Sequence, residues 1–117
     1  MAHAVVHWEI GGRDLDRLSL FYKELFDWEG AGFDPNYRLV TPPEGLGGGL
    51  MRCPDDTAPY VTVYVSVDDL DATLVRVKEL GGAPFVPPTP IPGVGSFALF
   101  KDPDGNILGI LQMPTGV

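Results

Sequence analysis

Apolar and polar residues alternate along residues 5–10, which predicts a β-strand with two different faces. One face is apolar and contains Val6, Trp8 and Ile10. The other face contains His7 and Glu9, an imidazole and a carboxylate. We therefore expect the apolar face to pack against a helix and the polar face to be hydrated or functional.

The spacing becomes helical after Gly11-Gly12, which we expect to release the chain from the strand. Asp14 is a suitable N-cap, because its carboxylate can accept hydrogen bonds from the first turn of a helix. The apolar positions then form one stripe, which we predict to be core: Leu15, Leu18, Phe21, Tyr22, Leu25 and Phe26.

The same strand-helix pattern recurs in residues 61–81, where valines alternate with polar residues and should face a second helix. Aligning Asp14-Leu15-Asp16 with Asp69-Leu70-Asp71 places His7 on Thr62 and Glu9 on Tyr64. This recurrence predicts two similar modules related by a pseudo-twofold axis. It also predicts that these four side chains face a shared site.

Five further strands are predicted, at residues 37–41, 46–51, 85–86, 97–100 and 107–111. Residues 30–36 are expected to form a polar loop, and the proline-rich residues 87–96 a stiff loop. Few helices separate the strands, so the class is α+β. We expect a single domain over residues 1–117, with module one at about 4–53 and module two at about 59–113.

The charge, cysteine content and apolar runs of the sequence limit the classes of partner and the location that we expect. The chain has 117 residues, eight Lys and Arg against 16 Asp and Glu, and a net charge of −8. That balance argues against nucleic-acid binding, which relies on clustered basic residues. Cys53 is the single cysteine, so no intrachain disulfide can form. With neither a signal pattern nor a long apolar run, we expect a cytoplasmic protein without membrane contact.

Five segments in order give the chain a family likeness: HWEI, FYKELFDW, GGGLM, VDDLDATLVRVKELGG and PIPGVGSFALFKDPDGN. This succession resembles the vicinal oxygen chelate superfamily, the fold of glyoxalase I, bleomycin-resistance proteins and extradiol dioxygenases, and in particular its small bacterial glyoxalase-like branch. The resemblance implies two βαβββ modules whose mixed sheets curl around a cavity. It also implies a homodimer, formed side by side or by exchange of modules.

Metal-using members of this superfamily take one ligand from each of four strands. The resemblance carries those positions to His7, Gly49, Thr62 and Gly109, and among them His7 is the one suitable metal ligand. A catalytic site for a first-row metal usually needs three protein ligands. We therefore expect no metal cofactor. The alternative is a divalent metal held by residues placed elsewhere or contributed by a partner chain.

The candidate catalytic group is His7, Glu9 and Tyr64, which could move a proton or orient a polar ligand. His7 as a hydrogen-bonded structural histidine and Glu9 as a surface carboxylate are the alternatives. The candidate ligand-binding residues are Gly49, Met51, Thr62, Phe97, Leu99, Gly109 and Leu111. The two glycines, in place of ligand side chains, predict a roomier and more apolar pocket.

These observations predict a glyoxalase-like protein that binds a small organic ligand and has a degenerate metal site. Two forms of this function are open: a metal-free acid-base enzyme, and a drug-sequestering protein. The alternative is a metal-dependent lyase, isomerase or dioxygenase of the same superfamily. The sequence leaves open whether catalysis occurs.

Overall fold

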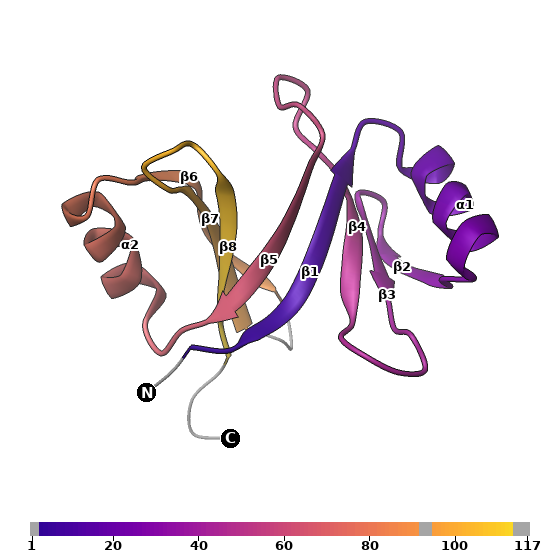
Figure 1. The fold of residues 1–117 in the computed structure, drawn as a ribbon, viewed down its shortest axis with the longest axis horizontal. Helices are drawn as coiled ribbons and strands as arrows, with labels where there is room; N and C mark the ends of the chain where they lie inside the picture. The colour runs from indigo at the N-terminus through magenta and orange to yellow at the C-terminus, as the bar shows by residue number, and fades with distance from the viewer. Residues whose placement is uncertain (1–2, 92–94, 114–117) are drawn as a thin grey trace. The chain divides into compact units, whose positions relative to one another are not determined.

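The computed structural model describes residues 3–91 and 95–113, which form two compact units (Figure 1). Residues Val6–Thr62 make one unit, and the described residues on either side of this range make the other. The chain crosses between the units near the start of β1 (Val5–Gly12) and within β5 (Tyr60–Ser66).

Each unit contains one helix and four strands or parts of strands. The Val6–Thr62 unit holds β1, α1 (Leu15–Phe26), β2 (Gly30–Asp34), β3 (Tyr37–Val40) and β4 (Gly48–Arg52). The other unit holds most of β5, α2 (Leu70–Glu79), β6 (Ala83–Ile91), β7 (Gly95–Lys101) and β8 (Ile107–Gln112). The strand-helix-strand-strand-strand order confirms the predicted α+β class.

The strands of the two units pair in the same way. In the first, the order is β2-β3-β4-β1, with β1 parallel to β4 and the other pairs antiparallel. In the second, the order is β6-β7-β8-β5, with β5 parallel to β8 and the other pairs antiparallel. The register pairs Glu9 with Gly49 and Tyr64 with Gly109. Both sheets are therefore mixed, as predicted.

The helix ends follow from local sequence, and the predicted N-cap at Asp14 is confirmed. Asp14 and Asp69 have extended backbones, and each carboxylate accepts a backbone N–H three residues ahead. These N-caps satisfy donors that the first helical turn leaves without partners. Gly81 follows α2 with a φ of 95°, a left-handed conformation that favours glycine.

Several predicted boundaries are wrong. β1 includes Gly11 and Gly12 and ends at Gly12, so the strand is two residues longer than predicted. Residues 30–34 form β2 rather than a loop, because their backbone pairs with β3. The proline-rich segment extends β6 to Ile91 instead of starting a loop after Val86. β6 lies at a sheet edge and its pairing contains two register shifts, which is where a strand tolerates proline.

The core of the Val6–Thr62 unit lies between α1 and its sheet. Leu15, Val40 and Leu50 are buried at its centre. The side chains packed around them are Trp8, Ile10, Leu18, Tyr22 and Trp28. This confirms that the Trp8 and Ile10 face of β1 meets a helix.

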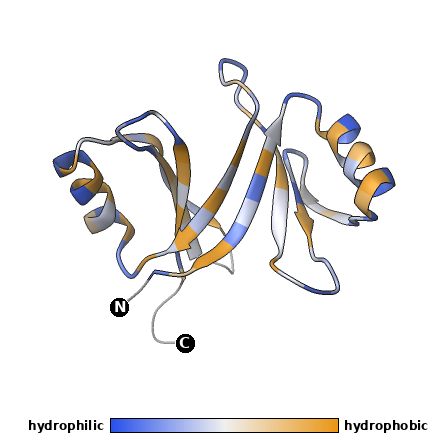
Figure 2. Ribbon diagram, in the orientation of Figure 1, coloured by the Kyte–Doolittle hydropathy of each residue, from blue (hydrophilic) through white to orange (hydrophobic). Residues whose placement is uncertain are grey.

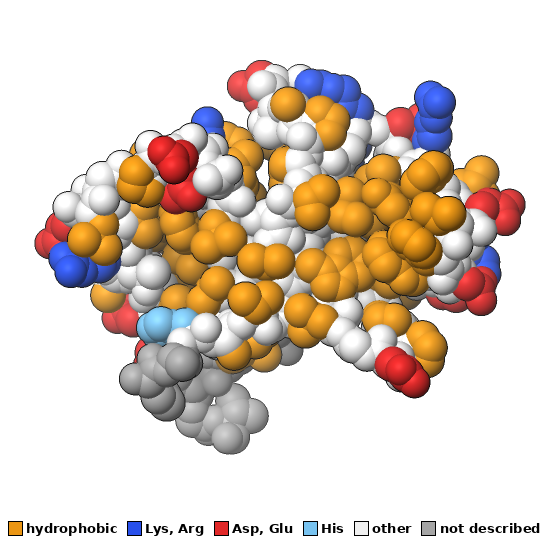
Figure 3. All heavy atoms as spheres, in the orientation of Figure 1, with side chains coloured by type: hydrophobic (Ala, Val, Ile, Leu, Met, Phe, Trp, Pro, Cys, Tyr) orange, Lys and Arg blue, Asp and Glu red, His pale blue; other side chains and the backbone are white. Residues whose placement is uncertain are grey.

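Half of the α1 stripe is not core, contrary to the prediction. Phe21, Leu25 and Phe26 are each more than half exposed, as is Leu20 beside them. Their spacing places them on one side of the helix, but the sheet beneath reaches only Leu15, Leu18 and Tyr22. Figure 3 shows hydrophobic side chains gathered on the surface over α1.

The core of the other unit lies between α2 and its sheet. Its buried residues are Val67, Leu70, Leu74, Ala98 and Ile110, with Val65 and Phe100 packed against them. Val61 differs from the other valines of β5, because 74% of its surface is exposed. The prediction that it faces a helix is wrong. Among the described residues, no helix is long and apolar enough to cross a membrane.

Candidate functional site

The polar face of β1 is the starting point of the candidate site. Hydropathy alternates along β1, as its changing colours show in Figure 2. Trp8 and Ile10 point toward the α1 core, so His7 and Glu9 lie on the opposite face. Glu9 is almost completely buried, with 1% of its surface exposed. It is therefore not a surface carboxylate, and burial requires that its oxygens be hydrogen-bonded.

Tyr37, at the start of β3, lies across the backbone of β4 at Gly49. A Cβ atom built on Gly49 would overlap the Tyr37 hydroxyl and ring carbons. Gly49 is the register partner of Glu9, so Tyr37 reaches the polar face of β1 at this position. The Tyr37 phenol can therefore lie beside His7 and Glu9 only because residue 49 of β4 is a glycine.

A series of hydrogen bonds runs along this face. The Nε2 atom of His7 lies 2.8 Å from the Tyr37 hydroxyl oxygen, and the two rings are stacked with centroids 6.4 Å apart. Tyr37 is also hydrogen-bonded to Glu9. The hydroxyl of Tyr60 donates to Oε2 of Glu9 at 2.8 Å. The sequence of contacts is His7–Tyr37–Glu9–Tyr60, which we call the relay.

Tyr60 closes the relay from the start of β5. Its ring lies against Gly11, where an added Cβ would come within 2.7 Å of a ring carbon. Its hydroxyl is 3.5 Å from the Met51 sulfur, so Met51 lies beside the carboxylate of Glu9. Gly11 and Gly49 therefore each leave room for one of the two phenols that hold Glu9.

The relay sets the protonation of its members. Burial is the largest cause that raises the pKa values of Tyr37 and Tyr60, and the neighbouring charge of Glu9 raises them further. Both phenols therefore stay protonated at neutral pH. Burial lowers the pKa of His7 below its ordinary value of 6.5, which favours the neutral imidazole.

These protonation states indicate the tautomer of His7. Tyr37 has one hydroxyl hydrogen, and its bond to the Glu9 carboxylate uses it. The Tyr37 oxygen must then accept the hydrogen bond from His7, so the His7 proton is assigned to Nε2. In this tautomer the lone pair of the neutral imidazole is on Nδ1.

The other unit brings together a second group of predicted residues. The Tyr64 ring lies against Gly109, its register partner, where an added Cβ would overlap ring carbons. The Phe97 ring centroid is 6.1 Å from that of Tyr64, in an edge-to-face arrangement. Leu99 is buried opposite Gly109, and Leu111 pairs with Phe97. These five residues form an aromatic and aliphatic cluster.

The predicted residues thus fall into two groups. His7, Glu9, Gly49 and Met51 belong to the Val6–Thr62 unit, whereas the group around Tyr64 belongs to the other unit. Thr62, also predicted, is buried at the end of the first unit. A single cavity that combines both groups stays a prediction.

The room predicted beside the two glycines is filled. Tyr37 takes the space next to Gly49, and Tyr64 takes the space next to Gly109. The absent side chains are therefore replaced by aromatic rings rather than by a larger cavity. A strand glycine is a place where a ring from a neighbouring strand can lie on the backbone.

Two relay members, Tyr37 and Tyr60, are missing from the sequence-based candidates. From the sequence, Tyr37 is predicted only as the first residue of a strand, and no prediction is made for Tyr60. The glycines opposite them, Gly49 and Gly11, are the one signal that could have indicated them. Pairing each glycine with its ring requires the strand register, which the sequence does not contain.

The donor atoms of this chain do not fit the metal centre that the family implies. In residues 3–91 and 95–113, no three His, Cys, Asp or Glu side chains come close enough to hold a metal ion. The His7 Nε2 atom is hydrogen-bonded to a phenol, and the phenol rings of Tyr37 and Tyr64 cover Gly49 and Gly109. We therefore derive no chemical step through a metal.

The chain matches the Glyoxalase/Bleomycin resistance protein/Dioxygenase superfamily over residues 4–110. Among curated relatives, a protein of Mycobacterium tuberculosis named as a glyoxylase, CFP32, is 38% identical over 78 residues. That match covers 66% of this chain and 30% of the relative, so the chain spans about a third of that protein's length.

Two solved structures show the same fold. Methylmalonyl-CoA epimerase from Mycobacterium tuberculosis is 17% identical with a TM-score of 0.67, and the match covers 94% of this chain and 87% of the epimerase. The Mn(II)-bound glyoxalase from Novosphingobium aromaticivorans is 21% identical with a TM-score of 0.64, and the match covers 95% of this chain and 40% of that protein. Fold and sequence agree with the resemblance drawn from the motifs, and the chain belongs to the glyoxalase, bleomycin-resistance and dioxygenase superfamily, the vicinal oxygen chelate fold.

Proposed function

We propose that this protein binds a small organic ligand and transfers a proton with His7, without a metal ion. The relay carries this proposal, because it supplies a base, fixes its tautomer and stabilises its charged form. The degenerate metal positions fit this proposal, since their places are taken by Tyr37 and Tyr64.

His7 acts as the base in this proposal. Its lowered pKa keeps the imidazole neutral at neutral pH, so Nδ1 can accept a proton from an acidic C–H or O–H group of the ligand. The resulting imidazolium donates from Nε2 to Tyr37, and Tyr37 donates to Glu9. The Glu9 charge is thus coupled to His7 through one phenol, and it stabilises the imidazolium. Delivery of that proton from Nδ1 to a different carbon of the ligand completes an isomerisation and regenerates neutral His7.

The remaining expectations belong to the same proposal. The cluster around Tyr64 provides apolar contact area for the ligand, and the two modules, 4–53 and 59–113, form one domain around a shared cavity. The protein works as a cytoplasmic homodimer. If the relay only holds the fold, the same ligand contacts would serve a sequestering protein of the drug-resistance type.

A metal-dependent lyase, isomerase or dioxygenase is the second candidate, favoured by the Mn(II)-bound glyoxalase of the same fold. The metal content of the purified protein distinguishes the metal-free proposal from the metal-dependent one. Protein purified without a histidine tag should contain no stoichiometric Zn, Ni, Fe or Mn by mass spectrometry. One equivalent of tightly held metal that is lost in His7→Ala would refute the proposal and support the metal-dependent enzyme.

Ligand binding is tested by thermal shift with a panel of aromatic and polycyclic compounds. A ligand that binds the native state raises the melting temperature by mass action. His7→Ala should reduce that shift without lowering the melting temperature of the ligand-free protein. His3→Ala is the matched control, because His3 is exposed and lies outside the Val6–Thr62 unit. Equal shifts in both variants would remove His7 from the binding site.

A further inference from the structure

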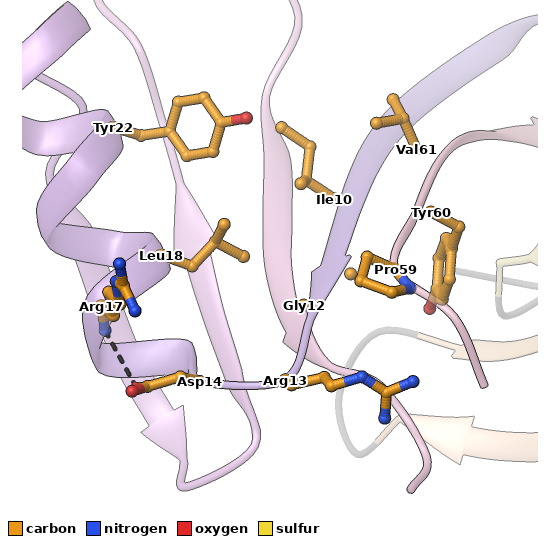
Figure 4. A pocket seen from close by; sticks show the side chains of 11 residues that line it. Ile10, Gly12, Arg13, Asp14, Arg17, Leu18, Tyr22, Pro59, Tyr60 and Val61 are labelled. Carbon is orange, nitrogen blue, oxygen red and sulfur yellow. Dashed lines mark hydrogen bonds between the residues drawn. The ribbon is translucent and has the colours of Figure 1, made fainter. Parts of the chain in front are cut away.

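A pocket of about 550 Å³ lies within the Val6–Thr62 unit, on the side of β1 that faces α1 (Figure 4). Its volume falls in the range of small-molecule sites. The residues around it are Ile10, Gly11, Gly12, Arg13, Asp14, Arg17, Leu18, Tyr22, Pro59, Tyr60 and Val61. His7, Glu9 and Tyr37 are not among them, and Tyr60 is the one relay member that lines the pocket.

The lining is divided into an apolar end and a charged end. Figure 4 shows Tyr22, Ile10 and Val61 at one end of the pocket and Arg13, Asp14 and Arg17 at the other. The apolar end includes a highly exposed valine, and water contact with such a side chain is unfavourable. A ligand with a hydrophobic body would cover this surface.

The charged end has a positive balance, with two guanidinium groups against one carboxylate. Asp14 is already used as the N-cap of α1, where it accepts the N–H of Arg17. The Arg13 guanidinium donates to the neutral backbone carbonyl of Asp55 at 2.8 Å. Within the described part of the chain, the ion pairs involve neither Arg13 nor Arg17.

The absence of an ion pair at Arg13 and Arg17 is unusual among the arginines of the described residues. Arg38, Arg52 and Arg76 each form an ion pair with a carboxylate. In a chain of net charge −8, carboxylates are abundant, yet the two arginines at this pocket have none. Guanidinium groups bind carboxylates with directional, charge-assisted hydrogen bonds. The charges at this end are therefore complementary to an anionic ligand.

We propose that this pocket is a second binding site for a hydrophobic carboxylate, with its ring or chain on Tyr22 and Val61 and its carboxylate near Arg13 and Arg17. The site stands apart from the proposed function of His7, because it shares no residue with the His7–Tyr37–Glu9 part of the relay. Tyr60 is the residue common to both, lining the pocket and donating to Glu9.

The test uses 2-naphthoate as the ligand and the neutral 2-naphthamide as its matched control, followed by ¹⁵N-HSQC titration. We expect 2-naphthoate to shift the amide signals of Gly12, Leu18 and Val61, and to bind more tightly than the amide. Arg13→Gln and Arg17→Gln should each weaken naphthoate binding roughly fivefold, which is the value of one exposed charge pair of about 1 kcal/mol.

Lys78→Gln is the matched charge control, because Lys78 is an exposed cation of α2 outside the pocket and in the other unit. It should leave naphthoate affinity unchanged, as should His7→Ala, so failure of this site and failure of the His7 proposal are distinguishable. Equal binding of acid and amide would overturn the proposal, as would naphthoate shifts centred on His7, Gly49 and Met51. Pocket signals that shift on dilution of a ligand-free dimer would also overturn it, because a second copy would then cover the pocket.

Discussion

Gly49→Ala should disrupt the relay by displacing the Tyr37 ring. The added methyl group would overlap the Tyr37 hydroxyl and ring carbons, well inside the roughly 3.5 Å of a normal carbon contact. The backbone of β4 cannot move without a large cost in free energy, because Gly49 is buried and pairs with both β1 and β3. The Tyr37 ring must therefore leave its place against the strand.

Two costs follow from that displacement. Overpacking a filled interior typically costs about 1–3 kcal/mol. Glu9, 1% exposed, also loses a hydroxyl donor; a hydrogen bond to a charged group contributes about 1.5–3 kcal/mol. The two costs share one cause and are not additive, so we expect the free energy of unfolding to fall by about 2–4 kcal/mol.

Urea denaturation of a double-mutant cycle measures this coupling. Gly49→Ala should cost little in a Tyr37→Leu background, because the ring that it displaces is already gone. Gly32→Ala is the matched control in the same sheet, where the nearest atom, of Arg38, would lie at an ordinary 3.4 Å. If Gly49→Ala and Tyr37→Leu prove additive, or if both alanine variants are equally stable, the reasoning is refuted.

Two further predictions concern pH and assembly. Stability should fall as the pH drops from 7 through His7's lowered folded pKa, because unfolded His7 takes up a proton near its ordinary pKa of 6.5 while folded His7 stays neutral. His7→Gln should reduce that fall in chemical denaturation, and His3→Gln should not; equal slopes would contradict the lowered pKa. In the second prediction, light scattering at micromolar concentration should show a dimer that Phe21→Glu, on the exposed face of α1, weakens and Val75→Glu on α2 does not. A monomeric parent protein would contradict it.

Elements decided by nearby residues were predictable. The alternation in β1 and the Asp14 and Asp69 caps depend on contacts within a few positions, so the sequence contains the necessary information. β2 was not predictable, since its glycine-rich residues form a strand only through pairing with β3. The same is true of β6, whose prolines are tolerated because it is paired along one edge alone.

Helical spacing alone could not show which residues of the α1 stripe are buried. It correctly placed Leu15, Leu18 and Phe21 on one stripe, but spacing does not show how wide the opposing sheet is. The core includes Leu18 and Tyr22 and leaves Phe21 mostly exposed. In the same way, the sequence identified His7 and Glu9 as neighbours on one face without the phenols that hold them, because those come from strands more than twenty positions away.

The two glycines at the predicted metal positions explain why the halves differ chemically. Gly49 and Gly109 occupy the same register, opposite Glu9 and Tyr64 respectively. In the second half the register partner itself, Tyr64, covers the glycine. In the first half the partner is a carboxylate, too small to cover Gly49, so the ring comes from Tyr37 on the far side of β4.

This difference places a phenol between a carboxylate and an imidazole in the first half alone. The second half places two rings, Tyr64 and Phe97, beside buried Leu99. One half therefore combines an imidazole, a phenol and a carboxylate, and the other packs two aromatic rings against a buried leucine. An exchange of Glu9 for a tyrosine would abolish that division, because its ring would compete with Tyr37 for the space over Gly49.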